Sequence, residues 1–151
     1  MRAILQRATA GAVSVDGEVI GQMEPAPGLV ILVGVGPEDG EAEARLLAEK
    51  IAGLRVFADA AGKMNLSLIE VGGGALVISQ FTLYADLRRG RRPGYTGAAS
   101  PEVAAPLVER LMDELRRLGA PVQGGRFGAH MEVRLTNDGP VTISLDTAMW
   151  R

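Results

Sequence analysis

Short apolar segments predict that the chain opens with β-strands. Residues 3–8 and 12–15 are strand-like, and Asp16-Gly17 before residues 18–20 is a strong signal for a two-residue hairpin turn. Residues 29–35 form a continuous apolar run rich in β-branched side chains, which is typical of a strand buried on both faces. The first part of the chain is therefore expected to be a β-meander.

Apolar residues recur at helical spacing in two longer segments. Residues 39–54 show this pattern, with Glu41 and Glu43 near the start, where the helix dipole favours acidic side chains. Residues 100–118 carry a second apolar stripe, which Gly119 is expected to end. We expect two main helices.

The remaining apolar runs are shorter and are separated by turn residues. They predict short or partly extended segments at 56–57 and 64–69, strands over 75–80, 131–136 and 141–145, a turn at Gly139-Pro140, and a loop over 86–99. Strands interspersed with two separated helices favour an α+β fold with mixed or antiparallel β-sheets. A chain of 151 residues suits a single domain, residues 1–151.

Composition excludes several kinds of chemistry. The absence of cysteine rules out disulfides, thiolate metal sites and a cysteine nucleophile, and His130 is the only histidine. We therefore expect neither metal nor cofactor. No apolar run reaches the roughly 20 residues of a membrane-spanning helix, and the N-terminal apolar stretch is too short for a signal peptide, so a cytoplasmic protein without membrane association is expected.

Two polar blocks follow apolar runs and are the candidates for a functional site. Ser79, Gln80, Phe81 and Thr82 end one strand, and the block over residues 137–142 follows another. Rigid strands position polar groups accurately, and hydrogen-bond donors stabilise a developing charge only when they are already in place. We therefore expect the site at these two strand ends.

Three other patterns have alternative interpretations. Ser79 or Thr82 could act as a nucleophile if His130 served as the base, although a lone histidine is more often structural. Gly139-Pro140 could be an ordinary hairpin turn. The cluster formed by Arg88, Arg89, Arg91 and Arg92 is more often a solvated loop than a phosphate-binding surface, although the planar guanidinium suits phosphate well.

Several blocks read together resemble one known family across nearly the whole chain. They are Leu5-Gln6-Arg7, Asp16-Gly17-Glu18, Lys63-Met64-Asn65-Leu66-Ser67, Ser79-Gln80-Phe81-Thr82-Leu83-Tyr84, Arg91-Arg92-Pro93, Gly125-Arg126-Phe127-Gly128-Ala129-His130-Met131 and Asn137-Asp138-Gly139-Pro140-Val141-Thr142. Their order and content resemble the D-aminoacyl-tRNA deacylases. The resemblance implies a barrel-like roll and a homodimer in which a cis Gly139-Pro140 peptide reaches into the pocket of the other subunit.

The same resemblance implies hydrolysis of D-aminoacyl-tRNA and glycyl-tRNA, that is, chiral proofreading. An L side chain would collide with the Gly139-Pro140 backbone, whereas a D side chain or glycine would not. Water would attack the ester with help from the ribose 2′-hydroxyl, while Gln80 and backbone N–H groups near Phe81 and Thr82 stabilise the oxyanion. Arg7 would orient the Gly-Pro carbonyl groups, and Phe127 and Met131 would pack against the terminal adenine.

Two segments depart from the family pattern: residues 23–27 are irregular, and Gly94-Tyr95 stands where serine and phenylalanine are usual.

Two competing functions stay open on the sequence alone. One is an esterase for small esters with a Ser or Thr nucleophile, and the other is a non-catalytic RNA-binding module that uses residues 88–92.

Overall fold

One long strand organises the sheet of this protein, whose computed structural model describes residues 1–150. β1 (Arg2–Val15) pairs antiparallel with β8 (Glu132–Asp146) along one edge. Along its other edge it pairs antiparallel with β2 (Glu18–Gln22) and β3 (Gly28–Gly34). Asp16 and Gly17 have φ angles of 50° and 80°, so the hairpin predicted between β1 and β2 is confirmed.

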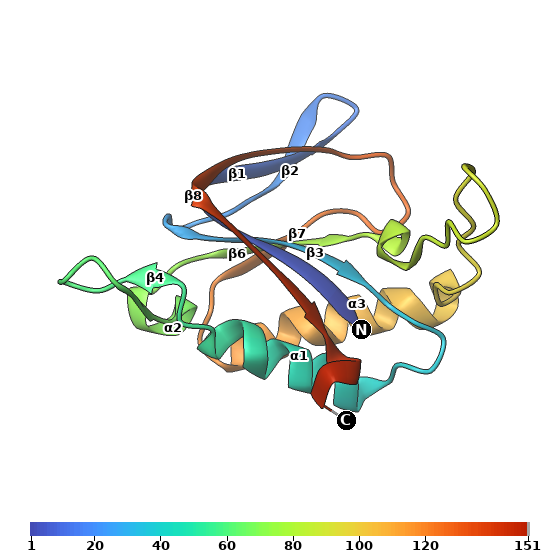
Figure 1. The fold of residues 1–151 in the computed structure, drawn as a ribbon. Helices are drawn as coiled ribbons and strands as arrows, with labels where there is room; N and C mark the ends of the chain where they lie inside the picture. Colours follow the sequence, from blue (N-terminus) through green and yellow to red (C-terminus); the bar gives the residue numbers. More distant parts are fainter. Residues whose placement is uncertain (151) are drawn as a thin grey trace.

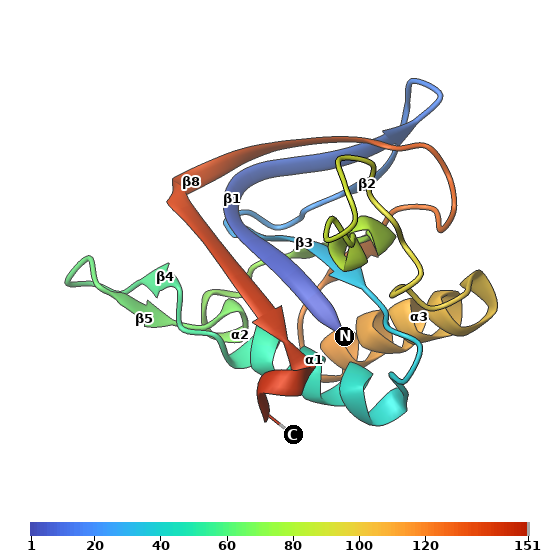
Figure 2. The same ribbon diagram turned by 45° about the vertical axis from the view of Figure 1, so that its right-hand side comes forward.

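The sheet continues in parallel and curves until it nearly closes. β3 pairs with β6 (Ala75–Ser79), and β6 pairs with β7 (Val122–Gly124), both in parallel. β7 returns toward β2, where the Gln22 N–H donates to Gln123 Oε1 at 2.7 Å. The result is a mixed, barrel-like roll (Figure 2), as expected for the α+β fold class.

Two helices cover one side of the roll (Figure 1), namely α1 (Glu41–Gly53) and α3 (Pro101–Arg117). Their apolar stripes, including Leu47, Ile51 and Leu111, are fully buried against the sheet. β3 contributes Ile31 to this layer and Val30 to a second cluster inside the roll, which confirms that the strand is buried on both faces. None of the helices within residues 1–150 is long and apolar enough to cross a bilayer.

Several short elements complete the chain. A separate hairpin consists of β4 (Phe57–Ala58) and β5 (Met64–Leu66). The prediction that residues 64–69 are only partly extended is confirmed: β5 ends at Leu66, and a short helix α2 (Leu68–Val71) follows. Ser67 caps it: its hydroxyl accepts from the Glu70 N–H at 3.2 Å, and its own N–H donates to Glu70 Oε2 at 2.7 Å. Two 3₁₀ turns are η1 (Phe81–Tyr84) and η2 (Thr147–Trp150).

The predicted turn at Gly139-Pro140 is wrong, because the chain does not reverse there. β8 runs through this dipeptide and pairs with β1 in the same antiparallel sense before and after it: Ala8 faces Asn137, and Gln6 faces Thr142. Residues 138–141 therefore bulge out opposite the single residue Arg7, an irregularity of the kind that redirects a strand next to a site. We call residues 138–141 the bulge.

The irregular segment over residues 23–27 rests on the glycines that precede β6. The Gly74 N–H donates to the Pro25 carbonyl oxygen at 2.7 Å. A Cβ atom on Gly74 would lie 2.2 Å from the Glu24 carbonyl oxygen, so only glycine allows this close approach. These contacts hold residues 24–25 next to the start of β6.

Candidate functional site

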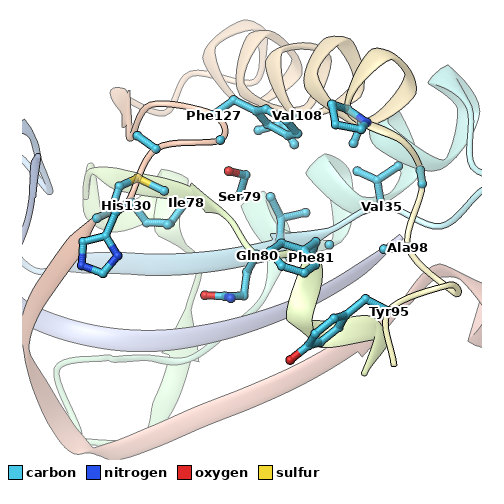
Figure 3. Close-up of a pocket in the computed structure, with 18 of the residues that line it drawn as sticks. Val35, Ile78, Ser79, Gln80, Phe81, Tyr95, Ala98, Val108, Phe127 and His130 are labelled. Atoms are coloured by element: carbon cyan, nitrogen blue, oxygen red, sulfur yellow. The ribbon is translucent and has the colours of Figure 1, made fainter. Parts of the chain in front are cut away.

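A cavity of about 520 Å³ opens at the end of β6, between the segment joining β7 to β8 and the start of α3. Ser79, Gln80 and Phe81 line one side of it, and Phe127 and His130 line the other (Figure 3). Its volume lies in the range of small-molecule sites, and its lining is mainly apolar with a few polar groups, as in such sites generally.

The polar block at the end of β6 is anchored by the sheet. Residues 75–78 are buried, and the Gln80 N–H donates to the Val33 carbonyl oxygen at 2.7 Å, which extends the β3–β6 pairing by one residue. The chain then turns into η1. The N–H groups of Phe81 and Thr82 stand at the start of this 3₁₀ turn, where no intrahelical acceptor exists. They are therefore open to an external acceptor.

Thr82 is turned toward Gln80. The Gln80 Nε2 donates a short hydrogen bond to Thr82 Oγ1, and Thr82 does not line the cavity. His130 also lines the cavity, but Figure 3 shows it apart from Ser79, with its imidazole turned away. No hydrogen bond joins His130 to either hydroxyl in the part of the chain that the structure describes. In this geometry His130 therefore does not act as a base on Ser79 or Thr82.

Phe127 and Met131 stand on the segment between β7 and β8. The Gly125 N–H donates to the Val77 carbonyl oxygen at 3.1 Å and so holds this segment next to β6. A Cβ atom on Gly125 would lie 2.5 Å from Met131 Sδ, so the absence of a side chain at Gly125 leaves room for Met131 in its present position. The structure thus places both residues in the same cavity as Ser79 and Gln80.

Arg7 and the bulge lie elsewhere on the same chain. Arg7 Nε donates to the Asp138 carbonyl oxygen at 3.0 Å, and Nη1 donates to the Val56 carbonyl oxygen at 2.7 Å. The Gly139-Pro140 peptide is cis, and both residues are exposed. Neither they nor Arg7 line the cavity.

Asn137 braces the bulge, a role that the sequence reasoning missed. Its Oδ1 accepts from the Val141 N–H at 2.8 Å, and its Nδ2 donates to Thr142 Oγ1 at 3.1 Å. An asparagine shortly before Gly-Pro is a common signal for a side chain that bonds the backbone further along, so the pattern could have indicated it. The contact of Arg7 with Val56 has no comparable signal, because 49 residues separate them.

The arginine-rich loop borders the cavity on the Tyr95 side. Arg88 donates to Asp86 through Nε at 2.9 Å and Nη2 at 2.7 Å. These bonds hold the pKa of the Asp86 carboxyl at about 2. Nearby, burial first and the charge of Asp39 second raise the pKa of the Tyr84 hydroxyl above its usual range. Over residues 1–150 no three His, Asp or Glu side chains are grouped so as to hold a metal ion.

Comparison with solved structures defines the class of this fold. The chain superposes with a TM-score of 0.82 on a structure described as a probable eukaryotic D-amino acid tRNA deacylase, over 95% of this chain and 97% of that one; at 17% identity this likeness concerns the fold. It superposes with a TM-score of 0.90 and 36% identity on a structure described as c-Myc DNA unwinding element binding protein, over 97% and 98% of the two chains.

Sequence comparison makes the assignment specific. The family model described as D-Tyr-tRNA(Tyr) deacylase matches residues 4–146, and the chain belongs to this family. A D-aminoacyl-tRNA deacylase of Roseiflexus castenholzii is 61% identical over 100% of this chain and 95% of its own length. One of Deinococcus radiodurans is 55% identical over 97% and 99%. The family is one of hydrolases that act on the ester bond of an aminoacyl-tRNA.

Proposed function

We propose that this protein hydrolyses the ester that joins a D-amino acid to the terminal adenosine of tRNA, and that it rejects the L form. The observation that carries the proposal is the match of the family model over residues 4–146, within which Ser79, Gln80, Phe127 and Met131 line one cavity. We extend the proposal to glycyl-tRNA, including tRNA(Ala) mischarged with glycine, because glycine carries no side chain that could be rejected.

The terminal adenosine would enter the cavity with its adenine against Phe127 and Met131. Both side chains are apolar and only partly buried, so a flat base can cover surface that is now exposed. This position would bring the ester carbonyl toward the end of β6.

The chemistry would use water as the nucleophile, with the ribose 2′-hydroxyl assisting the proton transfer. The oxyanion would accept hydrogen bonds from the N–H groups of Phe81 and Thr82 and from the Gln80 amide. Removal of one donor of this kind usually costs about 3 kcal/mol of transition-state stabilisation. Because Thr82 Oγ1 accepts from Gln80 Nε2, we assign Thr82 the role of positioning that amide.

Chiral selection would come from a second copy of the chain. Within one chain the bulge does not line the cavity, but Gly139 and Pro140 are exposed. The residues on either side of them are held in place, because Asp138 accepts a hydrogen bond from Arg7 and Val141 donates one to Asn137. In a homodimer the bulge of each subunit would face the cavity of the other, where the Gly139 carbonyl would bind the substrate amino group. An L side chain would then point at this backbone and be excluded.

A matched pair of substrates tests the proposal. D-tyrosyl-tRNA and L-tyrosyl-tRNA are incubated with the purified protein, and the remaining ester is measured over time. We expect rapid loss of the D form and survival of the L form. Equal rates on both would remove the selection mechanism, and rapid hydrolysis of small esters with no preference for tRNA would favour the esterase alternative.

A further inference from the structure

A small closed loop stands beside the mouth of the cavity. Asp86 and Gly94 exchange two backbone hydrogen bonds, of 2.8 and 2.9 Å, which close the loop over residues 87–93. All seven residues between them are exposed. The loop therefore projects into solvent from a fixed base, and Tyr95 follows directly after that base.

Three of the four arginines on this loop have no bonding partner among residues 1–150. Arg88 is bound to Asp86, whereas Arg89, Arg91 and Arg92 make no hydrogen bond or ion pair with any of residues 1–150. The protein as a whole has a net charge of −2, so these three guanidinium groups form a local positive surface on a slightly acidic molecule. Such a surface suits a polyanion, and the planar guanidinium suits phosphate in particular.

An exposed aromatic pair lines the cavity next to the base of this loop. The rings of Phe81 and Tyr95 meet edge to face, with centroids 5.0 Å apart and an angle of 76° between their planes. Phe81 is 57% exposed and Tyr95 is 38% exposed, and both line the cavity (Figure 3). Large aromatic side chains with this much free surface are available for stacking.

We propose that Phe81, Tyr95 and the three free arginines bind the single-stranded nucleotides that precede the terminal adenosine. One base would stack on the aromatic pair, and the phosphates would lie along Arg89, Arg91 and Arg92. Proteins that bind single-stranded nucleic acid combine these two features, a cationic track for the backbone and aromatic faces for the bases. The inference rests on the proposed function and adds a second binding site for the same substrate.

Two substrates of different length test the inference. D-tyrosyl-tRNA contains the preceding nucleotides, and D-tyrosyl-adenosine lacks them. We expect Tyr95→Ala to raise KM for the tRNA between about 5- and 150-fold, the usual range for loss of one stacking partner. The increase in KM for D-tyrosyl-adenosine should be at least fivefold smaller. Phe127→Ala, at the adenine position, should impair both substrates equally. Arg116→Ala, at the end of α3 that does not border the cavity, should impair neither.

Salt dependence separates the arginines from the aromatic pair. The triple variant Arg89→Ala, Arg91→Ala, Arg92→Ala should reduce the slope of log KM for the tRNA against log salt concentration by about 2, since each phosphate contact on a single strand contributes about 0.7. Tyr95→Ala should leave that slope unchanged. An unchanged slope in the triple variant would overturn the role of the arginines.

A binding measurement makes the outcome independent of catalysis. The probe is a four-nucleotide RNA that ends in CCA and carries a fluorescent 5′ label, and its anisotropy is measured with the wild type and with each variant. Weaker binding by Tyr95→Ala and by the triple variant supports the inference even if the wild type hydrolyses no aminoacyl ester. The inference would be overturned if the variants bound this RNA as tightly as the wild type, or if Tyr95→Ala raised KM equally for both substrates. Turnover of D-tyrosyl-tRNA would in that case still support the proposed function.

Discussion

The Arg7 side chain donates a hydrogen bond from Nε to the backbone carbonyl oxygen of Asp138, at 3.0 Å. The same guanidinium donates to the Val56 carbonyl oxygen at 2.7 Å and thereby ties the bulge of β8 to the start of the β4–β5 hairpin. One arginine thus connects three segments that are far apart in the sequence and holds the residue that precedes Gly139.

Replacement of Arg7 by alanine should loosen the bulge and weaken chiral selection. Two hydrogen bonds from a charged donor are lost, and each contributes about 1.5–3 kcal/mol. We expect the free energy of unfolding, measured by urea denaturation, to fall by roughly 3–6 kcal/mol. The rate on D-tyrosyl-tRNA should fall and that on L-tyrosyl-tRNA should rise. Arg134→Ala, at an exposed position on β8 where Arg134 makes no side-chain bond to any of residues 1–150, is the control and should change neither.

Gly139→Ala should disturb the bulge directly. Gly139 has a φ angle of 140°, and a Cβ atom there would lie 2.9 Å from the Val141 backbone nitrogen. We expect a loss of about 1–3 kcal/mol of stability from the disfavoured backbone conformation and a reduced preference for the D substrate. Gly53→Ala, at the end of α1 with free space around it, should be neutral or slightly stabilising. An unchanged enantiomer preference in Gly139→Ala would contradict the assigned role of the bulge.

A mixture of two inactive variants tests whether the bulge acts across a dimer interface. Gln80→Ala damages the cavity and Gly139→Trp damages the bulge, so neither homodimer should be active. A mixed dimer contains one cavity with an intact Gln80 that faces an intact bulge, and co-expression should restore part of the activity. If both elements served the same subunit, the mixed dimer would contain no intact site and activity would stay absent.

Thr82→Ala should keep substantial activity, because the proposed nucleophile is water. The variant removes the acceptor of the Gln80 amide, so we expect a moderate loss of kcat, about tenfold or less, from poorer positioning. Mass spectrometry of the wild type quenched during turnover should show no acyl adduct. An acyl group trapped on Thr82 or Ser79 would establish the covalent esterase mechanism instead.

Glu114 on α3 should make stability depend on pH. Its carboxylate accepts from Arg117 at 2.7 Å and lies 2.9 Å from Arg110 and 3.8 Å from Arg45. The hydrogen bond from Arg117, followed by the charges of these arginines, lowers the pKa of Glu114 in spite of its burial. A carboxylate with a lowered folded pKa stabilises the protein above its ordinary pKa of about 4.3, and this contribution is lost as the pH falls through the lowered value.

The prediction is that Glu114→Gln lowers Tm at pH 7 and has a smaller effect near pH 3, as measured by calorimetry. Glu109→Gln on the exposed side of the same helix is the control and should leave Tm nearly unchanged at both values. An equal decrease in Tm at both pH values would show that the charge of Glu114 is not the cause.

Elements whose signals are local could be predicted from the sequence. The apolar stripes of α1 and α3, the hairpin at Asp16-Gly17 and the buried strand β3 depend on spacing and on turn residues within a few positions, and the structure confirms them. The polar block from Ser79 to Thr82 was also found at a strand end, because a change from apolar to polar side chains marks where a buried strand leaves the sheet.

Tertiary pairing decided the rest. Residues 122–124 became β7 because they pair with β6, and no local pattern marks them as a strand. Gly139-Pro140 looked like a turn, yet pairing with β1 on both sides carries the chain straight through it. The cavity exists because the β6–β7 pairing brings Phe127 and Met131 beside Ser79, about 50 residues earlier in the chain. Sequence patterns report each segment's own preference, whereas the meeting of distant segments depends on hydrogen bonds and packing that form only in the folded chain.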